Sequence, residues 1–109
     1  MILRLWRGRA CIDSADAYQQ HVTTTVFPKL QRLPEYVRGR VLRRTIDGQV
    51  EFLVMTEWAS LGAVRAFAGD PLDRAIVEPA ARAVLTTFDD HVEHFEIVED
   101  DLRGAEKVS

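Results

Sequence analysis

The sequence predicts an α+β fold in which helices cover one face of a four-stranded antiparallel sheet. Three observations lead to this class. Segments with the alternation or β-branched content of strands lie near both ends of the chain and in its middle. The two middle strands flank Asp47-Gly48, a dipeptide that favours a tight hairpin turn. Segments with helical spacing separate the outer strands from this hairpin, which gives the βαββαβ order of a ferredoxin-like fold.

Three of the strands are expected at residues 2–10, 36–46 and 50–58. Their side chains alternate between the two faces of the sheet, so Arg4 and Trp6 share one face. The third strand is largely apolar on both faces, and one layer of helices can cover only one of them. The same face of a second copy would bury the other, which predicts a two-fold homodimer.

The first helix is expected to follow the first strand directly. Asp13 or Ser14 is the expected cap, because either side chain can accept a hydrogen bond from the first turn. The apolar residues at helical spacing are Ala15, Tyr18, Val22 and Val26. The run VTTTVF is intrinsically weak as a helix and Pro28 marks a kink or the last turn, so tertiary packing must hold this half.

The second helical region is expected to be broken into pieces. Ser60 is the cap of one helix and Gly69 its stop. Pro79 starts another helix, since proline is favoured in a first turn. The apolar set of that helix is Ala80, Val84, Leu85 and Phe88. The β-branched and aromatic run HVEHFEIV, residues 91–98, is the closing strand.

A chain of 109 residues is expected to form one domain, residues 1–98, followed by a polar, flexible tail, residues 99–109. No apolar run approaches the ~20 residues needed to cross a bilayer, and the first residues lack the order of a signal peptide. A cytoplasmic location without a membrane partner is therefore expected. The single cysteine, Cys11, is expected to serve packing.

Charge is distributed unevenly along the chain. Residues 1–48 hold nine Lys/Arg and four Asp/Glu, whereas residues 49–109 hold five and thirteen. The arginines are interleaved with apolar residues inside strands rather than grouped as a basic tail. Pairing between the two halves is therefore favoured over a nucleic-acid partner.

The sequence contains no motif of a cofactor site. The glycines at 39, 48, 62 and 69 are isolated, so no phosphate-binding loop is indicated. A serine hydrolase elbow and the HxxxH and CxxC patterns are also missing. Neither a metal nor a flavin or nicotinamide cofactor is expected.

The stretch FDDHVEHFEIV contains two histidines three residues apart. On a strand His91 and His94 point to opposite faces, so they cannot chelate one ion together. The acids around them are expected to pair with arginines of neighbouring strands, such as Arg4 or Arg7. If the face of Val92 looks into a pocket, His94 becomes a candidate proton acceptor.

Four stretches, in order, resemble the antibiotic biosynthesis monooxygenase (ABM) domain family of the dimeric α+β barrel superfamily. They are Thr56-Glu57-Trp58 at a strand end, LGAVRAFAGD, AIVEPAARAVLTTFD and HVEHFEIV. The similarity covers about residues 2–98. It implies a ferredoxin-like fold that pairs as a dimeric α+β barrel. It implies a reaction less firmly, because this fold hosts quinol and polyketide monooxygenases, haem-degrading enzymes and lactone isomerases.

The resemblance also implies a kind of site. Cofactor-free oxygenases of the family bind an electron-rich phenol or quinol between sheet and helices, and its anion reduces oxygen directly. Such a site needs an apolar pocket, a base and a hydrogen-bond donor. The candidates are the aromatic residues Trp58, Tyr18, Phe67 and Phe88 and the polar residues His21, Arg7 and Arg65. Each also has a structural interpretation, as a core aromatic or as a solvated polar side chain.

The haem-degrading branch of the family would require a histidine that ligates iron. The positions that match its functional residues look like Arg7, Phe67 and Val77, and valine cannot ligate iron, so haem is not expected. Two hypotheses remain. One is a cofactor-independent monooxygenase acting on a small aromatic substrate, with Trp58 and His21 nearest the chemistry. The other is a non-catalytic dimeric domain that binds a small hydrophobic ligand or has an accessory role.

Overall fold

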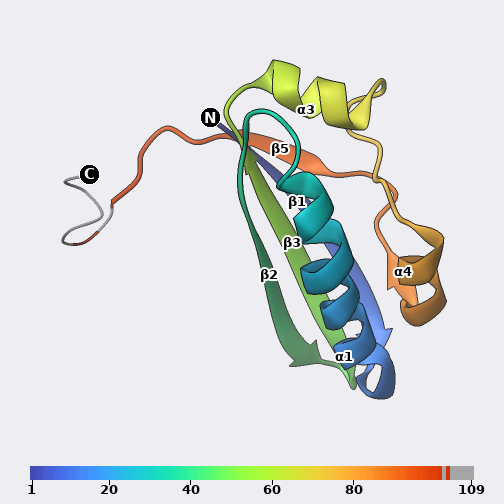
Figure 1. Cartoon of the computed structure of the whole chain (residues 1–109). Helices are drawn as coiled ribbons and strands as arrows, with labels where there is room; N and C mark the ends of the chain where they lie inside the picture. The colour runs from blue at the N-terminus through green and yellow to red at the C-terminus, as the bar shows by residue number, and fades with distance from the viewer. Residues whose placement is uncertain (102, 104–109) are drawn as a thin grey trace.

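The computed structural model describes residues 1–101 and 103, and its elements follow the predicted order (Figure 1). The first half consists of β1 (Ile2–Cys11), α1 (Ile12–His21), the π-helix η1 (Val22–Val26), α2 (Phe27–Leu30) and β2 (Tyr36–Ile46). The second half consists of β3 (Gln49–Trp58), α3 (Leu61–Ala68), α4 (Pro79–Val84), β4 (Thr87–Phe88) and β5 (Glu93–Glu96). The α+β class predicted from the sequence is confirmed. Most of the tail predicted to be flexible lies outside the described residues.

The sheet is antiparallel, with the order β2-β3-β1-β4, and β5 also pairs with β1. β4 pairs with Gly8 and Arg9, whereas β5 pairs with Ile2–Leu5. Both segments therefore lie along the same edge of β1 and together form the fourth strand of the ferredoxin-like arrangement.

The closing strand is shorter than the predicted span of residues 91–98. The chain between β4 and β5 bonds to the preceding loop instead: Val92 N donates to Asp73 O over 2.8 Å, and His91 forms an isolated bridge with Arg74. The prediction that Phe88 belongs to a helix is also wrong. α4 ends at Val84, and Thr86 N donates to Arg9 O over 2.8 Å, which starts the pairing with β1.

The long helical segment crosses the sheet as one continuous rod made of α1, η1 and α2 (Figure 1). The predicted cap at Asp13 or Ser14 is wrong, because β1 runs straight into the helix and Cys11 is the N-cap, without a side-chain hydrogen bond. The prediction that Cys11 serves packing is also wrong, because this last residue of β1 is exposed. The segment expected to be weak is the π-helix.

Local sequence explains why the regular helix is lost there. The hydroxyl of Thr24 donates to the Gln20 carbonyl over 2.7 Å, and that of Thr23 to the Gln19 carbonyl over 3.2 Å, so side chains compete for the helical acceptors. Pro28 then supplies no N–H donor in the next turn. Such π-turns inside helices are frequently found at functional sites.

The predicted turns and caps of the middle of the chain are confirmed. Asp47 and Gly48 have φ angles of 52° and 75°, the two left-handed residues of a tight hairpin. Ser60 Oγ accepts a hydrogen bond from Ala63 N over 3.1 Å at the start of α3. Gly69 ends that helix with a φ of 74°.

The core is divided into two clusters between the helices and one face of the sheet. The larger cluster contains Ala10, Ala15, Tyr18, Val22, Val50, Phe52, Ala81 and Leu85. The smaller contains Leu30, Trp58, Ala63 and Val64. Val26 packs against both clusters and lines the cavity described below.

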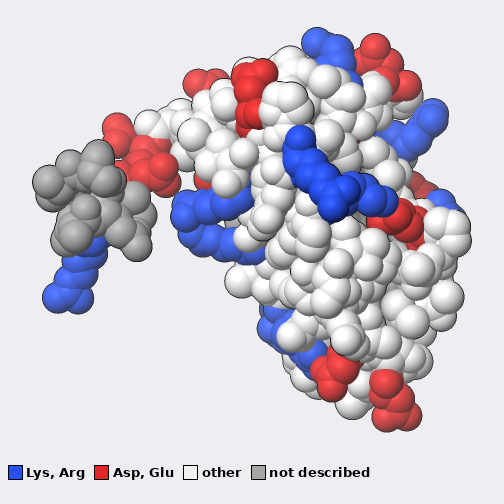
Figure 2. Space-filling model, in the orientation of Figure 1, with Lys and Arg blue, Asp and Glu red and all other residues white. Residues whose placement is uncertain are grey.

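The opposite face of the sheet is largely apolar, and none of the described helices covers it. Leu42 and Phe95 are 44% and 48% exposed, and Leu5, Leu53 and Met55 are half-buried there. On the helix-covered face, basic and acidic side chains are interspersed around a broad neutral area (Figure 2). In the described part of the chain, no helix has both the length and the apolar character to cross a membrane.

Candidate functional site

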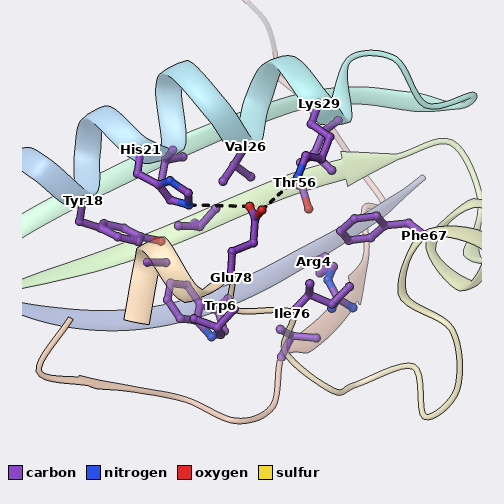
Figure 3. A pocket seen from close by; sticks show the side chains of 16 residues that line it. Arg4, Trp6, Tyr18, His21, Val26, Lys29, Thr56, Phe67, Ile76 and Glu78 are labelled. Carbon is purple, nitrogen blue, oxygen red and sulfur yellow. Dashed lines mark hydrogen bonds and ion pairs between the residues drawn. The ribbon is translucent and has the colours of Figure 1, made fainter. Parts of the chain in front are cut away.

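A cavity of about 260 Å³ lies between the sheet and the α1–η1–α2 rod (Figure 3). Its polar lining consists of Arg4, Tyr18, His21, Lys29, Thr56 and Glu78. Its apolar lining consists of Trp6, Val22, Val26, Leu30, Val54, Phe67, Ile76, Val77, Ala81 and Val92. This combination of a mostly apolar wall with a few converging polar groups is typical of a small-molecule site.

Secondary structure explains which residues reach the cavity. Arg4 and Trp6 are two apart on β1, and Val54 and Thr56 are two apart on β3, so each pair shares the face below the helices. Tyr18, Val22 and Val26 of the rod follow at intervals of four, which places them on one side of it. The loop between α3 and α4 supplies the remaining wall through Ile76, Val77 and Glu78.

His21 is the most unusual polar group of this site. Its Nε2 atom is buried and has no hydrogen-bond partner in the described part of the chain, although Oε1 of Glu78 lies 3.7 Å away. Oε2 of the same carboxylate accepts a hydrogen bond from Lys29 Nζ over 3.0 Å (Figure 3). If Nε2 takes up a proton, the contact with Glu78 becomes an ion pair. The arrangement therefore suits an imidazole that accepts a proton and is stabilised afterwards by a carboxylate.

Tyr18 lies beside His21, with 6.4 Å between the ring centroids. It is 3% exposed, packs against Phe52 at 4.8 Å between centroids and reaches the cavity with its ring. Burial raises the pKa of the Tyr18 phenol far above its ordinary value. Tyr18 is therefore a neutral hydrogen-bond donor at neutral pH rather than a base.

Arg4 forms the other polar end of the cavity, next to Phe67 and Ile76 (Figure 3). Its guanidinium is held by Leu72 O, Arg74 O and His94 Nε2, each at 2.9 Å. Burial lowers the pKa of Arg4 to about 10, so the side chain is still a cation at neutral pH.

Trp58 and His94, two of the predicted catalytic residues, lie behind the lining. Trp58 is fully buried, stacks on Phe67 with 5.1 Å between centroids and donates from Nε1 to Thr56 Oγ1 over 3.0 Å. His94 does not line the cavity itself, but its Nε2 accepts a hydrogen bond from Arg4, which does. Val92, two residues before His94, also lines the cavity. Burial first, and then the charge of Arg4, lower the pKa of His94.

Three predicted substrate-binding residues lie away from this cavity. Arg7 is on the opposite face of the sheet and pairs with Glu93 at 2.9 Å, one of the ion pairs expected between the two halves. Phe88 packs against Trp6 at 6.4 Å between centroids. Arg65 is on the outer side of α3, where it lies 3.6 Å from Asp70. Of the predicted site residues, Tyr18, His21 and Phe67 line the cavity.

No sequence pattern indicated Glu78, Lys29, Arg4 or Trp6 as site residues. Arg4 and Trp6 could have been found, because the predicted strand put them on the same face. Glu78 precedes a helix-starting proline and Lys29 follows Pro28, positions that carry no signal of a shared site. His91 and His94 face different sides, since His91 lies beside Leu5 and Arg7.

Comparisons with known proteins identify the fold. No protein-family model matches the sequence, and no curated protein matches it significantly. A structure of a proposed antibiotic biosynthesis monooxygenase from Deinococcus radiodurans is 15% identical, with 95% of this chain and 100% of that chain covered and a TM-score of 0.66. A protein from Bacillus cereus with the same proposed assignment is 11% identical, with 94% and 97% covered and a TM-score of 0.67. This chain has the ABM fold.

A third similar structure is that of the haem degrader MhuD from Mycobacterium tuberculosis, with two haems bound in its active site. It is 19% identical, with 93% of this chain and 99% of that chain covered and a TM-score of 0.60. The ABM-like resemblance of the sequence is thus confirmed in the fold. Identities this low leave the reaction to be argued from the site itself.

The lining residues do not fit a haem group. Val77, at the position expected to ligate iron, offers no donor, and His21 Nε2 faces the Glu78 carboxylate. The volume of about 260 Å³ is below the ~300–1,000 Å³ common for drug-sized ligands. Within residues 1–101 and 103, no three His, Cys, Asp or Glu side chains are grouped to hold a metal ion.

Proposed function

We propose that this chain is a cofactor-independent monooxygenase that oxidises a small aromatic phenol or quinol with O2 in the cavity. The observation that carries the proposal is the buried Nε2 of His21, which has no hydrogen-bond partner among the described residues and lies in the lining of a mostly apolar cavity, 3.7 Å from Oε1 of Glu78. A buried polar atom without a partner is unfavourable unless a ligand satisfies it. A phenolic hydroxyl group would supply that partner.

The reaction begins when His21 accepts the phenolic proton and Glu78 stabilises the resulting imidazolium. The electron-rich anion transfers one electron to O2, and superoxide and the ring radical combine to form a carbon–oxygen bond. The peroxide takes the proton back from His21, loses the ring hydrogen and one oxygen as water, and leaves a carbonyl group. For anthrone, the balance is anthrone plus O2 giving anthraquinone plus water.

Other residues orient the substrate in this proposal. Tyr18 donates a hydrogen bond to the developing anion, because burial raises its pKa and keeps its hydroxyl group protonated. Phe67 presents its ring to the cavity, and Trp58 stacks behind it at 5.1 Å and fixes its tilt. Trp58 is thus a positioning residue, and His94 acts in the same way on Arg4.

Oxygen uptake tests the proposal with a panel of anthrone-like and hydroquinone substrates. We expect turnover in the wild type and a loss of about a hundredfold or more in His21→Ala, the usual range for a general base. His91→Ala is the matched control, because this histidine is exposed and lies away from the cavity. Trp58→Phe should reduce turnover less than His21→Ala does.

The same experiment addresses the alternative function. Equal turnover in the wild type and His21→Ala would remove the proposed base. If no substrate of a broad panel is oxidised but phenols bind tightly, the chain is a ligand-binding domain of this fold. The cavity supports both hypotheses, and oxygen consumption separates them.

We also propose that two chains pair through the uncovered sheet face, and that the dimer works in the cytoplasm. The central residues of this face are Leu3, Leu5, Leu42, Leu53, Met55 and Phe95, which the strand register places side by side. An apolar face of this kind is normally covered by a partner. A sedimentation mass of one chain at micromolar concentration would exclude the dimer, and Leu53→Glu should produce that mass.

A further inference from the structure

Arg4 differs from Arg7 of β1 and Arg44 of β2, because no carboxylate is among its hydrogen-bond partners. Arg7 and Arg44 are surface residues whose guanidinium groups lie 2.9 Å and 2.8 Å from carboxylate oxygens of Glu93 and Glu51. Arg4 is only 6% exposed, and its three hydrogen-bond partners are two backbone carbonyls and an imidazole. Within the described residues, no carboxylate lies within ion-pair distance of Arg4.

A buried cation without an anion is energetically unfavourable. Carbonyl groups offset part of the lost hydration but do not remove the charge. Asp73 acts on Arg4 at longer range and favours its charged form, but burial is the larger effect. In the cavity lining, Lys29 and Glu78 neutralise each other, so Arg4 leaves one positive charge uncompensated.

The guanidinium is also fixed in place before any ligand arrives. Two carbonyl groups of the loop and His94 Nε2 hold one side, and the ring of Phe67 lies 5.7 Å from the guanidinium carbon. These contacts use three N–H groups of Arg4. The two others have no acceptor among residues 1–101 and 103 and remain available for a planar anion.

We propose that Arg4 binds a carboxylate of the ligand, so that the substrate is an aromatic carboxylic acid. This inference rests on the proposed function and specifies its substrate class. The carboxylate lies at the Arg4 end of the cavity, and the phenolic hydroxyl lies at the opposite end, where Tyr18 and His21 are found (Figure 3). The aromatic body of the substrate spans the apolar wall between them. His94 is a positioning residue that keeps the guanidinium turned toward the cavity.

Calorimetric titration with a matched pair of probes tests the inference. The probes are a hydroxynaphthoate and the primary amide of the same compound, which have nearly the same shape and differ in charge. At neutral pH we expect the wild type to bind the carboxylate at least about tenfold more tightly than the amide, as a charge-assisted hydrogen-bonded pair would give. Arg4→Gln should reduce that ratio to about one, and Arg4→Lys should keep part of it.

The controls separate this inference from the proposed function. Arg65→Gln removes an exposed arginine outside the cavity and should leave the ratio unchanged. Arg4→Gln also removes contacts with the loop, so circular dichroism must first show that the variant has the wild-type fold. If it does not fold, the affinity ratios of the wild type and of Arg4→Lys decide the question. Equal affinity of the wild type for both probes would overturn the carboxylate site while leaving the oxygenase proposal intact. Binding of neither probe, with no oxygen uptake, would overturn both.

Discussion

Replacing Glu78 with glutamine tests the electrostatic role of the carboxylate beside His21 Nε2. The change keeps the shape and removes the negative charge 3.7 Å from Nε2. Two charges near 4 Å interact by about 1 kcal/mol in water and about 4 kcal/mol at a protein surface. The His21 and Glu78 side chains are 12% and 33% exposed, and Lys29 also pairs with the carboxylate, so an intermediate value applies. We therefore expect the substitution to reduce the electrostatic stabilisation of the imidazolium by about 1.5–3 kcal/mol.

This loss corresponds to a fall in kcat of roughly 10- to 150-fold, since 1.4 kcal/mol is a factor of ten. Oxygen uptake at saturating substrate measures it, and KM should change little because the lost interaction acts only after the proton has moved to His21. Lys29→Gln is the matched control: it removes the competing cation, so kcat should stay the same or rise. A kcat of Glu78→Gln equal to that of the wild type would refute the proposed stabilisation of His21.

Three further predictions concern stability and ligand chemistry. Trp58→Ala should lower the free energy of unfolding by about 3–5 kcal/mol, measured by urea denaturation, because the side chain is fully buried; a loss below about 1 kcal/mol would contradict its place in the core. His94 has a lowered pKa, so the unfolded chain binds more protons just below the ordinary value of 6.5, and stability should fall as the pH drops through that region. His94→Gln should flatten this dependence in thermal unfolding, and an equally steep curve would argue against it. Haemin should give no Soret band of histidine ligation in the wild type; a band that disappears in His21→Ala would show that this imidazole reaches iron.

Local signals were sufficient to predict most of the elements. Asp47-Gly48 can adopt the left-handed angles of a hairpin turn, and Ser60 caps the helix that it begins. Contacts between distant segments decided where these rules failed. α1 begins before Asp13 because β1 leads directly into it. Phe88 lies in a strand rather than in α4 because it pairs with the edge of β1.

The candidate site was predicted only in part, for the same reason. Tyr18 and His21 share a helix, so spacing alone placed them near each other. Arg4 and His94 are 90 positions apart in the sequence, and His21 and Glu78 are 57 apart. Their contacts depend on the register of the strands and on the path of the loop. Neither can be derived from a pattern within one segment.

The loop before α4 forms one wall of the cavity, yet its outer end is tied to the rod through Lys29 and Glu78. Lys29 is 61% exposed, and ion pairs of this kind contribute about 0–1 kcal/mol and are screened by salt. Thermal motion at room temperature is therefore enough to break the Lys29–Glu78 ion pair often. The ion pair thus contributes little to holding this wall of the cavity in place, and raising the ionic strength should change the affinity of the cavity for small molecules only slightly.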